Sequence, residues 1–421
     1  MLRRFVPVFV LVVSVGGIPS PAEASSPTCK QVLARFPTGV VRTKAQASRL
    51  VGAGLARPVV NQKFYATARR LDRTNSGMLC IVEANKRFFA RGLGASTTAS
   101  STDPRVAEHP AVSAAAASAI DAARGTCLVA MRDGQIIGEW YWGGRTPSTR
   151  TIGYSTSKPL TAAVVGAAEK LGLLTLDQSV ADFVPEWRGT SKAAITIRHL
   201  MTHTSGLSTE GQNLAQALST SAGHSTAVAV GLPLAKTPGS TFEYDPSSFI
   251  MQILIRVIER ATGEKFVAFA EKFVLRPVGM TSSSYLGDDP TTSNQSGDPW
   301  LAGGLQTTCR DLARLGQLFH RQGNWEGRQI FTPEFAAQAN AAQVLTPNYG
   351  HSAYGLLISH LPGGLGHGGF CGQWMQTLAS GVTIAAMSTT TSLLESTTPL
   401  CSTQRTSAMV AAVIAATHRS L

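Results

Sequence analysis

Acidic residues are nearly missing from the N-terminal part of this 421-residue chain, and charged residues are scarce throughout, at 15%. Residues 25–100 hold thirteen Lys or Arg but only two acids, Asp72 and Glu83, which gives a net charge of +11. Residues 101–421 hold 22 residues of each sign, so almost all of the overall charge of +12 lies before residue 101. This division indicates a basic extension joined to a neutral body that is apolar enough to bury a large core.

Beyond residue 18 the sequence has no apolar run long enough to cross a membrane. The run at residues 5–18 follows Arg3 and Arg4 and precedes Ala22-Glu23-Ala24, a small-x-small cleavage pattern. A membrane anchor is the alternative, but the run is short for spanning a bilayer. We interpret residues 1–24 as a signal peptide and expect an exported protein, periplasmic or secreted, with no transmembrane segment in the mature chain.

The sequence also lacks paired Cys-x-x-Cys spacing, which argues against a zinc site built on its six cysteines. In an oxidising compartment these cysteines could form disulfides, and buried free thiols are the alternative. We predict a bridge between Cys29 and Cys80, because the small extension around them gains most from a closed loop. The remaining four allow three pairings, which the sequence does not rank: Cys127, Cys309, Cys371 and Cys401.

The basic extension at residues 25–100 suggests an anionic partner in the cell envelope, such as lipid headgroups or cell-wall polymer. A solubilising basic surface explains the same charges. Nucleic acid is not expected as a partner, because the chain is exported and has no recognisable binding motif. A linker at residues 101–110 would separate the extension from a domain at residues 111–421.

Residues 153–171, GYSTSKPLTAAVVGAAEKL, carry the strongest chemical signal of the chain. Ser155 and Lys158 are three residues apart at the entrance to an apolar segment with helical spacing, so they would share one face. Pro159 is tolerated only in the first turn of a helix, which places the helix start near Ser155. A lysine held neutral could act as the base for such a serine, although a capping Ser and a solvated Lys fit the same spacing.

Two competing motifs fail at single residues. His199 and His203 have the spacing of a zinc pair, but Leu200 stands where a metalloprotease has glutamate, so we interpret both as structural. The segment 153–157 departs by one residue from Gly-x-Ser-x-Gly, the nucleophile elbow of α/β-hydrolases. That fold needs strands and helices that alternate through the middle of the chain, where helix and loop patterns dominate. No metal or cofactor is expected.

Several further segments occur in one order that is typical of a known family. After the STSK box at 155–158, they are LLTLDQSVADFVPEW (173–187), HLMTHTSGL (199–207), PGSTFEY (238–244), RPVGM (276–280), AGGLQTTCRDLARLGQLF (302–319) and GHGGFCG (366–372). With these motifs the chain resembles the β-lactamase-related serine hydrolases over about residues 110–420. This family includes class C β-lactamases, D,D-peptidases, serine esterases and nylon-oligomer hydrolases.

The resemblance implies a role for each matching residue. Ser155 would be the nucleophile, Lys158 its base and Tyr244 the hydroxyl that shuttles protons to the leaving group. His367, Gly368 and Gly369 occupy the place of the family's Lys-Thr-Gly strand motif, where small residues let substrate approach. The backbone N–H groups of Ser155 and Phe370 would form the oxyanion hole.

One position departs from the family pattern. Where many relatives have Tyr-x-Asn, this chain has Tyr244-Asp245-Pro246, and proline cannot supply the side-chain amide that holds a substrate carbonyl. Whether Asp245 or Ser247 compensates stays open. We therefore expect an exported hydrolase of a small-molecule or short-peptide amide or ester. The alternatives are a β-lactamase or D,D-carboxypeptidase, and a catalytically silent envelope-binding protein.

The resemblance implies an α+β fold, with an antiparallel sheet flanked by helices and a mostly helical region inserted between Ser155 and about His360. Residues 126–142 and 369–389 would supply sheet strands, with a tight turn at Ser380-Gly381. A terminal helix at residues 403–418 would pack on that sheet. The natural substrate, the preference between ester and amide, and the oligomeric state stay open.

Overall fold

A computed structural model describes residues 40–41, 59–60, 78–79, 125–210, 224–244, 249–285, 298–346 and 351–388. The signal peptide, the linker, the Cys29–Cys80 bridge and the terminal helix at 403–418 therefore lie outside the described residues. Three short strands of the extension form one sheet in the order β2-β1-β3, namely β1 (Val40–Val41), β2 (Val59–Val60) and β3 (Met78–Leu79).

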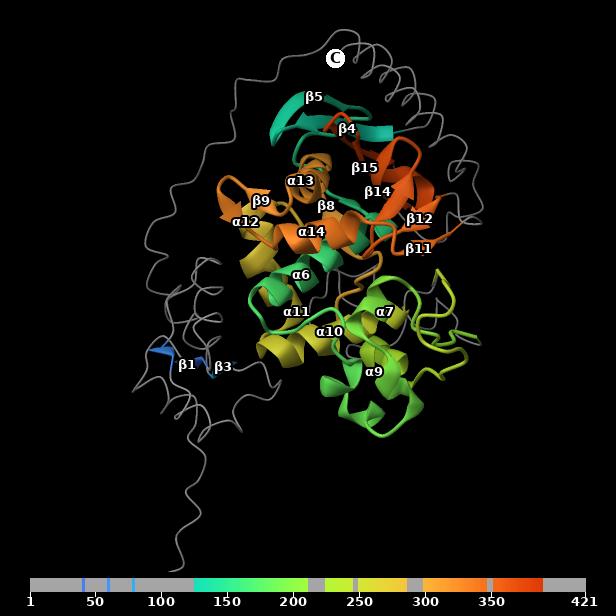
Figure 1. Ribbon diagram of the computed structural model, residues 1–421. Helices are drawn as coiled ribbons and strands as arrows, with labels where there is room; N and C mark the ends of the chain where they lie inside the picture. The colour runs from blue at the N-terminus through green and yellow to red at the C-terminus, as the bar shows by residue number, and fades with distance from the viewer. Residues whose placement is uncertain are drawn as a thin grey trace, which may run out of the picture.

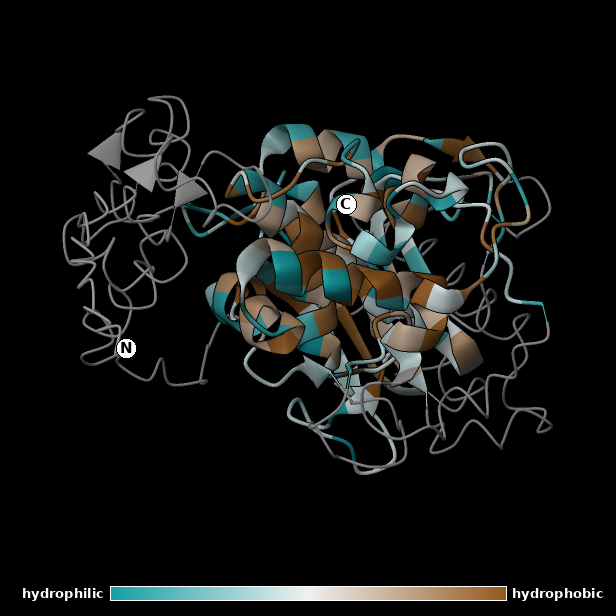
Figure 2. Ribbon diagram, turned by 90° about the horizontal axis from the view of Figure 1, so that it is seen from below, coloured by the Kyte–Doolittle hydropathy of each residue, from teal (hydrophilic) through white to brown (hydrophobic). Residues whose placement is uncertain are grey.

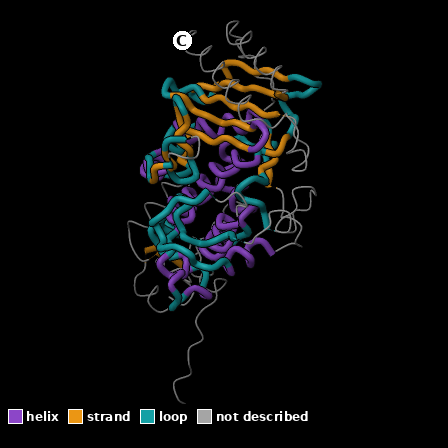
Figure 3. Tube along the Cα trace, turned by 90° about the vertical axis from the view of Figure 1, so that its right-hand side faces the viewer, coloured by secondary structure: helices purple, strands orange, loops and turns teal. Residues whose placement is uncertain are grey.

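The body is built on an eight-stranded, fully antiparallel sheet at one end of the molecule (Figures 1 and 3). Its order is β11-β12-β13-β14-β15-β16-β4-β5, which confirms the predicted sheet of early and late strands. The strands are β4 (Gly125–Arg132), β5 (Gln135–Tyr141), β11 (Val344–Leu345), β12 (Ala353–Tyr354), β13 (Ser359–Leu361), β14 (Gly364–Gly369), β15 (Gln373–Leu378) and β16 (Thr383–Ser388).

The central strands are apolar on both faces, which explains their nearly continuous hydrophobic sequence. In β4, Cys127, Val129 and Met131 belong to the main core, whereas Leu128 and Ala130 belong to a second buried cluster on the opposite face. Side chains alternate along a strand with a period of two, so both layers follow from one run of apolar residues. The predicted turn at Ser380-Gly381 joins β15 to β16, with Gly381 at φ +83°.

Helices and short helical turns fill the region between the early and late strands, as predicted. They are η2 (Tyr154–Ser157), α6 (Lys158–Lys170), η3 (Val180–Asp182), η4 (Pro185–Trp187), η5 (Ser191–Ala194), α7 (Ile197–Met201), α9 (His224–Gly231), α10 (Phe249–Thr262), α11 (Phe266–Ala270), η6 (Glu271–Leu275), α12 (Arg276–Val278), α13 (Cys309–His320), α14 (Pro333–Asn340) and η7 (Phe370–Gly372). None of the described helices is long and apolar enough to span a bilayer.

Helix α6 is the central helix of the body. Every residue from Lys158 to Ala168 is buried, and a helix that is apolar on all sides needs neighbours on all sides. Helices α10, α13 and α14 contact it, and α13 also packs on β4, β15 and β16. Figure 2 shows hydrophobic and hydrophilic residues alternating along the helices of the body. Ser155 thus lies just before a helix that is buried from Lys158 to Ala168.

Small sheets complete the framework. Strands β6 (Thr151–Ile152), β8 (Leu305–Thr307) and β7 (Ser284–Tyr285) form one sheet in that order, and β9 (Asn324–Trp325) pairs with β10 (Arg328–Gln329). A disulfide joins Cys127 on β4 to Cys309 at the start of α13, at a sequence separation of 182. It selects one of the pairings that the sequence left unranked.

Candidate active site

The turn that carries Ser155 is fixed by hydrogen bonds from both sides. Thr156 donates from its hydroxyl to the Gly153 carbonyl at 2.7 Å, and Ser157 Oγ accepts from the Leu305 backbone N–H at 3.0 Å. Thr156 and Ser157 are fully buried, whereas Ser155 is half-buried and open to a ligand. The hydroxyls of Thr156 and Ser157 therefore anchor the turn, whereas the hydroxyl of Ser155 is accessible to a ligand.

Lys158 is buried beside Ser155. Its Nζ lies 3.0 Å from Ser155 Oγ and 3.2 Å from the carbonyl oxygen of Ala302, and its side chain has no exposed surface. Pro159 occupies the first turn of α6, as its missing N–H requires. The two residues meet as the sequence predicted, and the Ala302 carbonyl is a partner that no motif had indicated.

Tyr244 lies against the same lysine. Lys158 Nζ is 4.8 Å from the centre of the Tyr244 ring, so base and phenol share one small space. The backbone N–H of Glu243 donates to the His203 carbonyl at 2.9 Å, and the His203 ring lies 5.1 Å from that of Tyr244. The HTSGL segment thus holds Tyr244 in place. His203 was interpreted as merely structural, yet it packs directly on a candidate catalytic side chain.

The imidazole of His203 is buried and has no hydrogen-bond partner at either nitrogen within the described part of the chain. Burial, together with the charge of Lys158, holds the pKa of His203 well below its ordinary value. The ring is therefore neutral at physiological pH. His199, by contrast, caps α7: its Nδ1 accepts from the Thr196 backbone N–H at 3.2 Å.

His367 on β14 is held by two hydrogen bonds. Its Nδ1 lies 2.6 Å from the Gly368 carbonyl, which can only accept, so Nδ1 carries the proton. Its Nε2 therefore accepts from the Tyr354 hydroxyl at 3.0 Å. Burial, and secondarily the charge of Lys158, lowers the pKa of His367 to about 3. The ring lies 6.2 Å from Tyr244 and uses both nitrogens internally, which favours an ordering role over proton transfer.

The end of β14 touches the nucleophile turn. A Cβ added at Gly369 would come 2.6 Å from the Gly153 carbonyl oxygen and 3.3 Å from the Ser155 nitrogen. Only glycine allows this approach, which explains the small residues of the GHGG motif. At Gly368 an added Cβ would meet the Trp374 ring at 3.0 Å. The predicted oxyanion-hole donors, Ser155 N–H and Phe370 N–H, thus belong to two segments that are in contact.

Aromatic side chains pack against Tyr154, the residue that precedes Ser155. The rings of Tyr154 and Phe370 are 5.4 Å apart, and those of Tyr154 and Trp300 are 6.4 Å apart. Tyr154 and Trp300 are buried, whereas Phe370 keeps 39% of its surface exposed. We call these three residues the aromatic wall. An exposed phenylalanine beside a nucleophile offers an apolar contact to part of a substrate.

Three residues near Tyr244 lie outside the described residues, namely Asp245, Pro246 and Ser247. Their effect on substrate binding stays a prediction. Among the described residues, no group of three or more His, Cys, Asp or Glu side chains could hold a metal ion.

Comparison with known proteins identifies the family of this chain. The family model described as Beta-lactamase matches residues 113–399, which is more than half of the chain. The chain belongs to the β-lactamase family. Esterase EstB of Burkholderia gladioli is 31% identical over 153 residues, covering 32% of this chain and 38% of the esterase. The 6-aminohexanoate-dimer hydrolase of Paenarthrobacter ureafaciens is 25% identical over 215 residues, covering 48% of this chain and 54% of that enzyme.

The matched regions thus span about a third to a half of these two relatives, one an esterase and one an amide hydrolase. Solved structures confirm the β-lactamase fold. EstCE1, a hydrolase with promiscuous acyltransferase activity, superposes with a TM-score of 0.58 at 17% identity, over 72% of this chain and 97% of its own. A penicillin-binding protein homologue from Caulobacter crescentus gives 0.57 at 17% identity, over 75% and 99%.

Sequence reasoning missed two residues of this family site. Tyr354, which fixes the tautomer of His367, stands in a short strand without a recognised motif. Trp300 precedes the AGGL segment, and its ring covers Gly303, where an added Cβ would come within 2.4 Å of it. The glycine pair 303–304 was the one available signal, because adjacent glycines often mark close packing against a large ring.

Proposed function

We propose that this protein is a serine hydrolase that cleaves an ester or amide bond through an acyl-enzyme on Ser155. One observation carries the proposal: the buried Nζ of Lys158 lies 3.0 Å from Ser155 Oγ. A nucleophile and a base within hydrogen-bond reach, with the base oriented by a third group, are the signature of covalent catalysis. The Ala302 carbonyl at 3.2 Å is that third group here.

The reaction follows from this arrangement. In the deprotonated form that this step requires, Lys158 donates one N–H to Ala302 and accepts the Ser155 proton while Oγ bonds to the substrate carbonyl carbon. The oxyanion is stabilised by the N–H groups of Ser155 and Phe370. The intermediate then expels the alcohol or amine, which takes the proton from Lys158 directly or through the Tyr244 hydroxyl. A water molecule attacks the acyl-enzyme in the same way and restores Ser155.

We infer a preference for simple esters with an apolar group. The exposed Phe370 of the aromatic wall favours an apolar contact, and Pro246 cannot offer the side-chain amide that penicillins and D-alanyl peptides require. Leaving one polar substrate group unpaired costs about 1–3 kcal/mol, or roughly ten- to a hundredfold in rate. The similarity to esterase EstB supports this preference.

The test combines labelling and kinetics. A fluorophosphonate should add once, at Ser155, as located by peptide mass. Short p-nitrophenyl esters should be hydrolysed readily and cephalosporins slowly or not at all. A cephalosporin cleaved with the higher kcat/KM would favour the alternative, a β-lactamase or D,D-carboxypeptidase. Absence of any adduct in folded protein would favour the second alternative, a catalytically silent envelope-binding protein.

We further propose that the protein is exported and that residues 25–100 bind anionic envelope material. The Cys127–Cys309 disulfide supports export, because disulfides persist mainly in oxidising compartments. The mature protein recovered from its native host should begin at Ser25.

Binding of residues 25–100 to anionic vesicles or cell wall should weaken as salt rises, since charge attraction is screened beyond about 8 Å at physiological ionic strength. If deletion of residues 25–100 leaves co-sedimentation of the protein with vesicles or cell wall unchanged, the basic residues serve only to keep the protein soluble.

A further inference from the structure

Tyr154, the residue before the candidate nucleophile, has a backbone conformation that bulky side chains rarely adopt. Its φ angle is +46°, in the left-handed region where glycine is the usual residue. Such a conformation costs stability and persists only where the surrounding structure fixes it, often at a functional site. A glycine at this position would make the turn at less cost, so the tyrosine ring calls for its own explanation.

The ring of Tyr154 contacts two other aromatic rings edge-to-face. It lies 5.4 Å from the ring of Phe370 at an interplanar angle of 74°, and 6.4 Å from that of Trp300 at 78°. Aromatic pairs favour this arrangement, because the positive edge of one ring meets the negative face of the other. Tyr154 keeps only 3% of its surface exposed, so it is too buried to bind a substrate. Its ring must act through its neighbours.

The contact with Phe370 joins the two segments that carry the proposed oxyanion-hole donors. The Ser155 N–H belongs to the planar peptide unit between Tyr154 and Ser155, so the backbone of Tyr154 helps to set its direction. The second donor is the N–H of Phe370, whose own ring takes part in the contact. The backbone before Tyr154 is fixed from the other side, because the Gly153 N–H donates to the Leu305 carbonyl at 2.7 Å.

Trp300 supports the same ring from the segment that holds the proposed base. Its side chain is buried, and two residues further along the chain the Ala302 carbonyl lies 3.2 Å from Lys158 Nζ. Tyr154 is therefore in contact with residues from the segments of both donors and of the base.

We propose that Tyr154 is a positioning residue of the oxyanion hole: through its ring contacts it keeps the N–H groups of Ser155 and Phe370 directed at one point. Donors stabilise the transition state only when they are aimed at the oxygen where charge develops. Misplacement by about 1 Å can cost roughly a hundredfold in rate. This role rests on the proposed acyl-enzyme reaction and adds to it a residue that does not touch the substrate.

The first test compares variants of Tyr154 on p-nitrophenyl butyrate. Tyr154→Leu removes the ring and should lower kcat about ten- to a hundredfold, while KM changes by about threefold or less. Tyr154→Phe keeps the ring and should restore kcat to within about threefold of wild type. Tyr154→Gly permits the positive φ angle without a ring and should resemble Tyr154→Leu. Fluorophosphonate labelling of Ser155, followed to completion by mass, counts the competent sites to which each kcat refers.

Butylboronic acid gives a second readout, aimed at the oxyanion hole itself. Ser155 Oγ bonds to the trigonal boron, the serine proton passes to Lys158, and the tetrahedral anion places one oxygen near the proposed donors. Because this adduct resembles the transition state, its inhibition constant should rise in Tyr154→Leu by about the factor by which kcat falls. A merely structural role would lower the number of competent sites and leave both constants unchanged per site.

Phe370→Leu breaks the same ring pair from its exposed side, so it tests the role even if Tyr154→Leu does not fold. Its kcat should fall as well, and the double variant with Tyr154→Leu should be little worse than either single one, because both remove one contact. Wild-type kcat in Phe370→Leu would overturn the positioning role.

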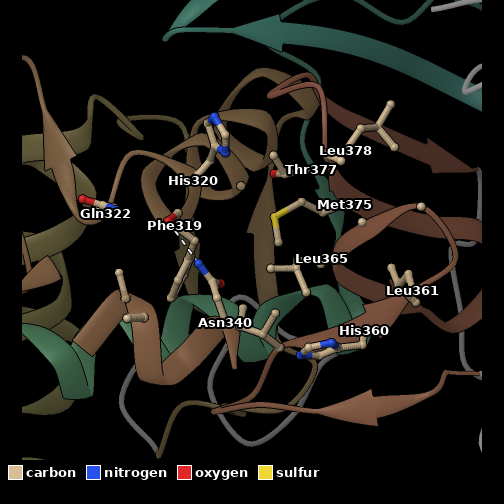
Figure 4. A pocket seen from close by; sticks show the side chains of 18 of the residues that line it. Phe319, His320, Gln322, Asn340, His360, Leu361, Leu365, Met375, Thr377 and Leu378 are labelled. Atoms are coloured by element: carbon tan, nitrogen blue, oxygen red, sulfur yellow. Dashed lines mark hydrogen bonds between the residues drawn. The ribbon is translucent and has the colours of Figure 1, made fainter. Parts of the chain in front are cut away.

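Two controls separate this role from a general loss of packing. Phe269→Leu removes a buried ring that lies 4.5 Å from the ring of Phe273, on α11 and η6. Leu365→Ala truncates a residue of β14 that lines a cavity of about 590 Å³, which neither Tyr154 nor Phe370 lines (Figure 4). Both variants should keep kcat and the boronate inhibition constant near wild type.

Wild-type kcat in Tyr154→Leu or Tyr154→Gly would overturn the positioning role and leave the proposed function intact. An unchanged boronate inhibition constant in a slow Tyr154→Leu enzyme would do the same, as would an equal fall of kcat in Phe269→Leu. A wild-type protein that hydrolyses no ester and takes no fluorophosphonate would instead overturn the proposed function, and the role of Tyr154 with it.

Discussion

At the scale of single residues, Ser155 and Lys158 are proposed to act as one catalytic unit, because a serine nucleophile is weak without its base. We predict that Ser155→Ala abolishes ester hydrolysis and that Lys158→Ala does nearly the same. Losses within such a unit are strongly non-additive, so the double variant should be little worse than either single one. Steady-state kinetics with p-nitrophenyl esters measures all three. A Ser155→Ala variant with activity close to wild type would end the serine-hydrolase proposal.

Tyr354 orients His367, and burial is the main cause of the lowered pKa of that histidine. The Tyr354 O–H donates to Nε2, a bond that only the neutral imidazole can accept, so Tyr354→Phe should raise the pKa of His367 from about 3. In wild type the pH dependence of kcat/KM should show no limb from this histidine above about pH 4. In the variant a limb should appear at higher pH and coincide with the His367 titration seen by nitrogen NMR.

The control for that prediction is Tyr141→Phe, because Tyr141 also donates a hydrogen bond, to Glu139, but lies on β5 away from the site. It should leave the pH profile unchanged. Titration of His367 near its ordinary pKa of about 6.5 in wild-type protein would contradict the assigned hydrogen bonds.

The same shift links His367 to stability. Its folded-state pKa is depressed below the unfolded value, so the unfolded chain binds more protons between about pH 6.5 and 3. The stabilising contribution is complete above pH 6.5 and is lost as pH falls, at roughly 1.4 kcal/mol per pH unit for one histidine. Buried His203, whose pKa is also lowered, adds to this loss.

At the scale of secondary-structure elements, the contact between β14 and η2 brings together the segments that carry the proposed oxyanion-hole donors. Gly369→Ala would place a Cβ 2.6 Å from the Gly153 carbonyl and push the two elements apart. We expect kcat to fall by about 10²- to 10³-fold, the usual effect of losing one oxyanion donor, while KM changes less. Gly231→Ala is the control, since an added Cβ there meets nothing within 4 Å. A Gly369→Ala enzyme with wild-type kcat would show that this contact does not shape the site.

At the scale of the whole molecule, the Cys127–Cys309 bridge ties an early strand to a helix that begins 182 residues later. In the chain-entropy model a loop of this length is worth about 5 kcal/mol. We predict that Cys127→Ala with Cys309→Ala lowers the urea midpoint strongly, because both residues are buried where β4 meets α13. An unchanged urea midpoint in the double variant would show that the disulfide does not stabilise the folded protein.

The sequence by itself determined the family, the STSK turn before an apolar helix, and the pair of residues that we propose as nucleophile and base. These features are local: hydroxyl, amine, proline and helix spacing lie within one stretch, and the motifs that follow keep a recognisable order. The strands of the sheet could also be predicted from the sequence, because their apolar runs and the turn at Gly381 are encoded by neighbouring residues.

Only the tertiary structure decided what lies around that pair. The Ala302 carbonyl, the tautomer of His367 and the packing of His203 on Tyr244 all depend on segments distant in sequence. The disulfide pairing is of the same kind, since six cysteines carry no local mark of their partners. Such contacts are set by how strands pair and helices pack against them, and a one-dimensional pattern records neither distance nor direction between those elements.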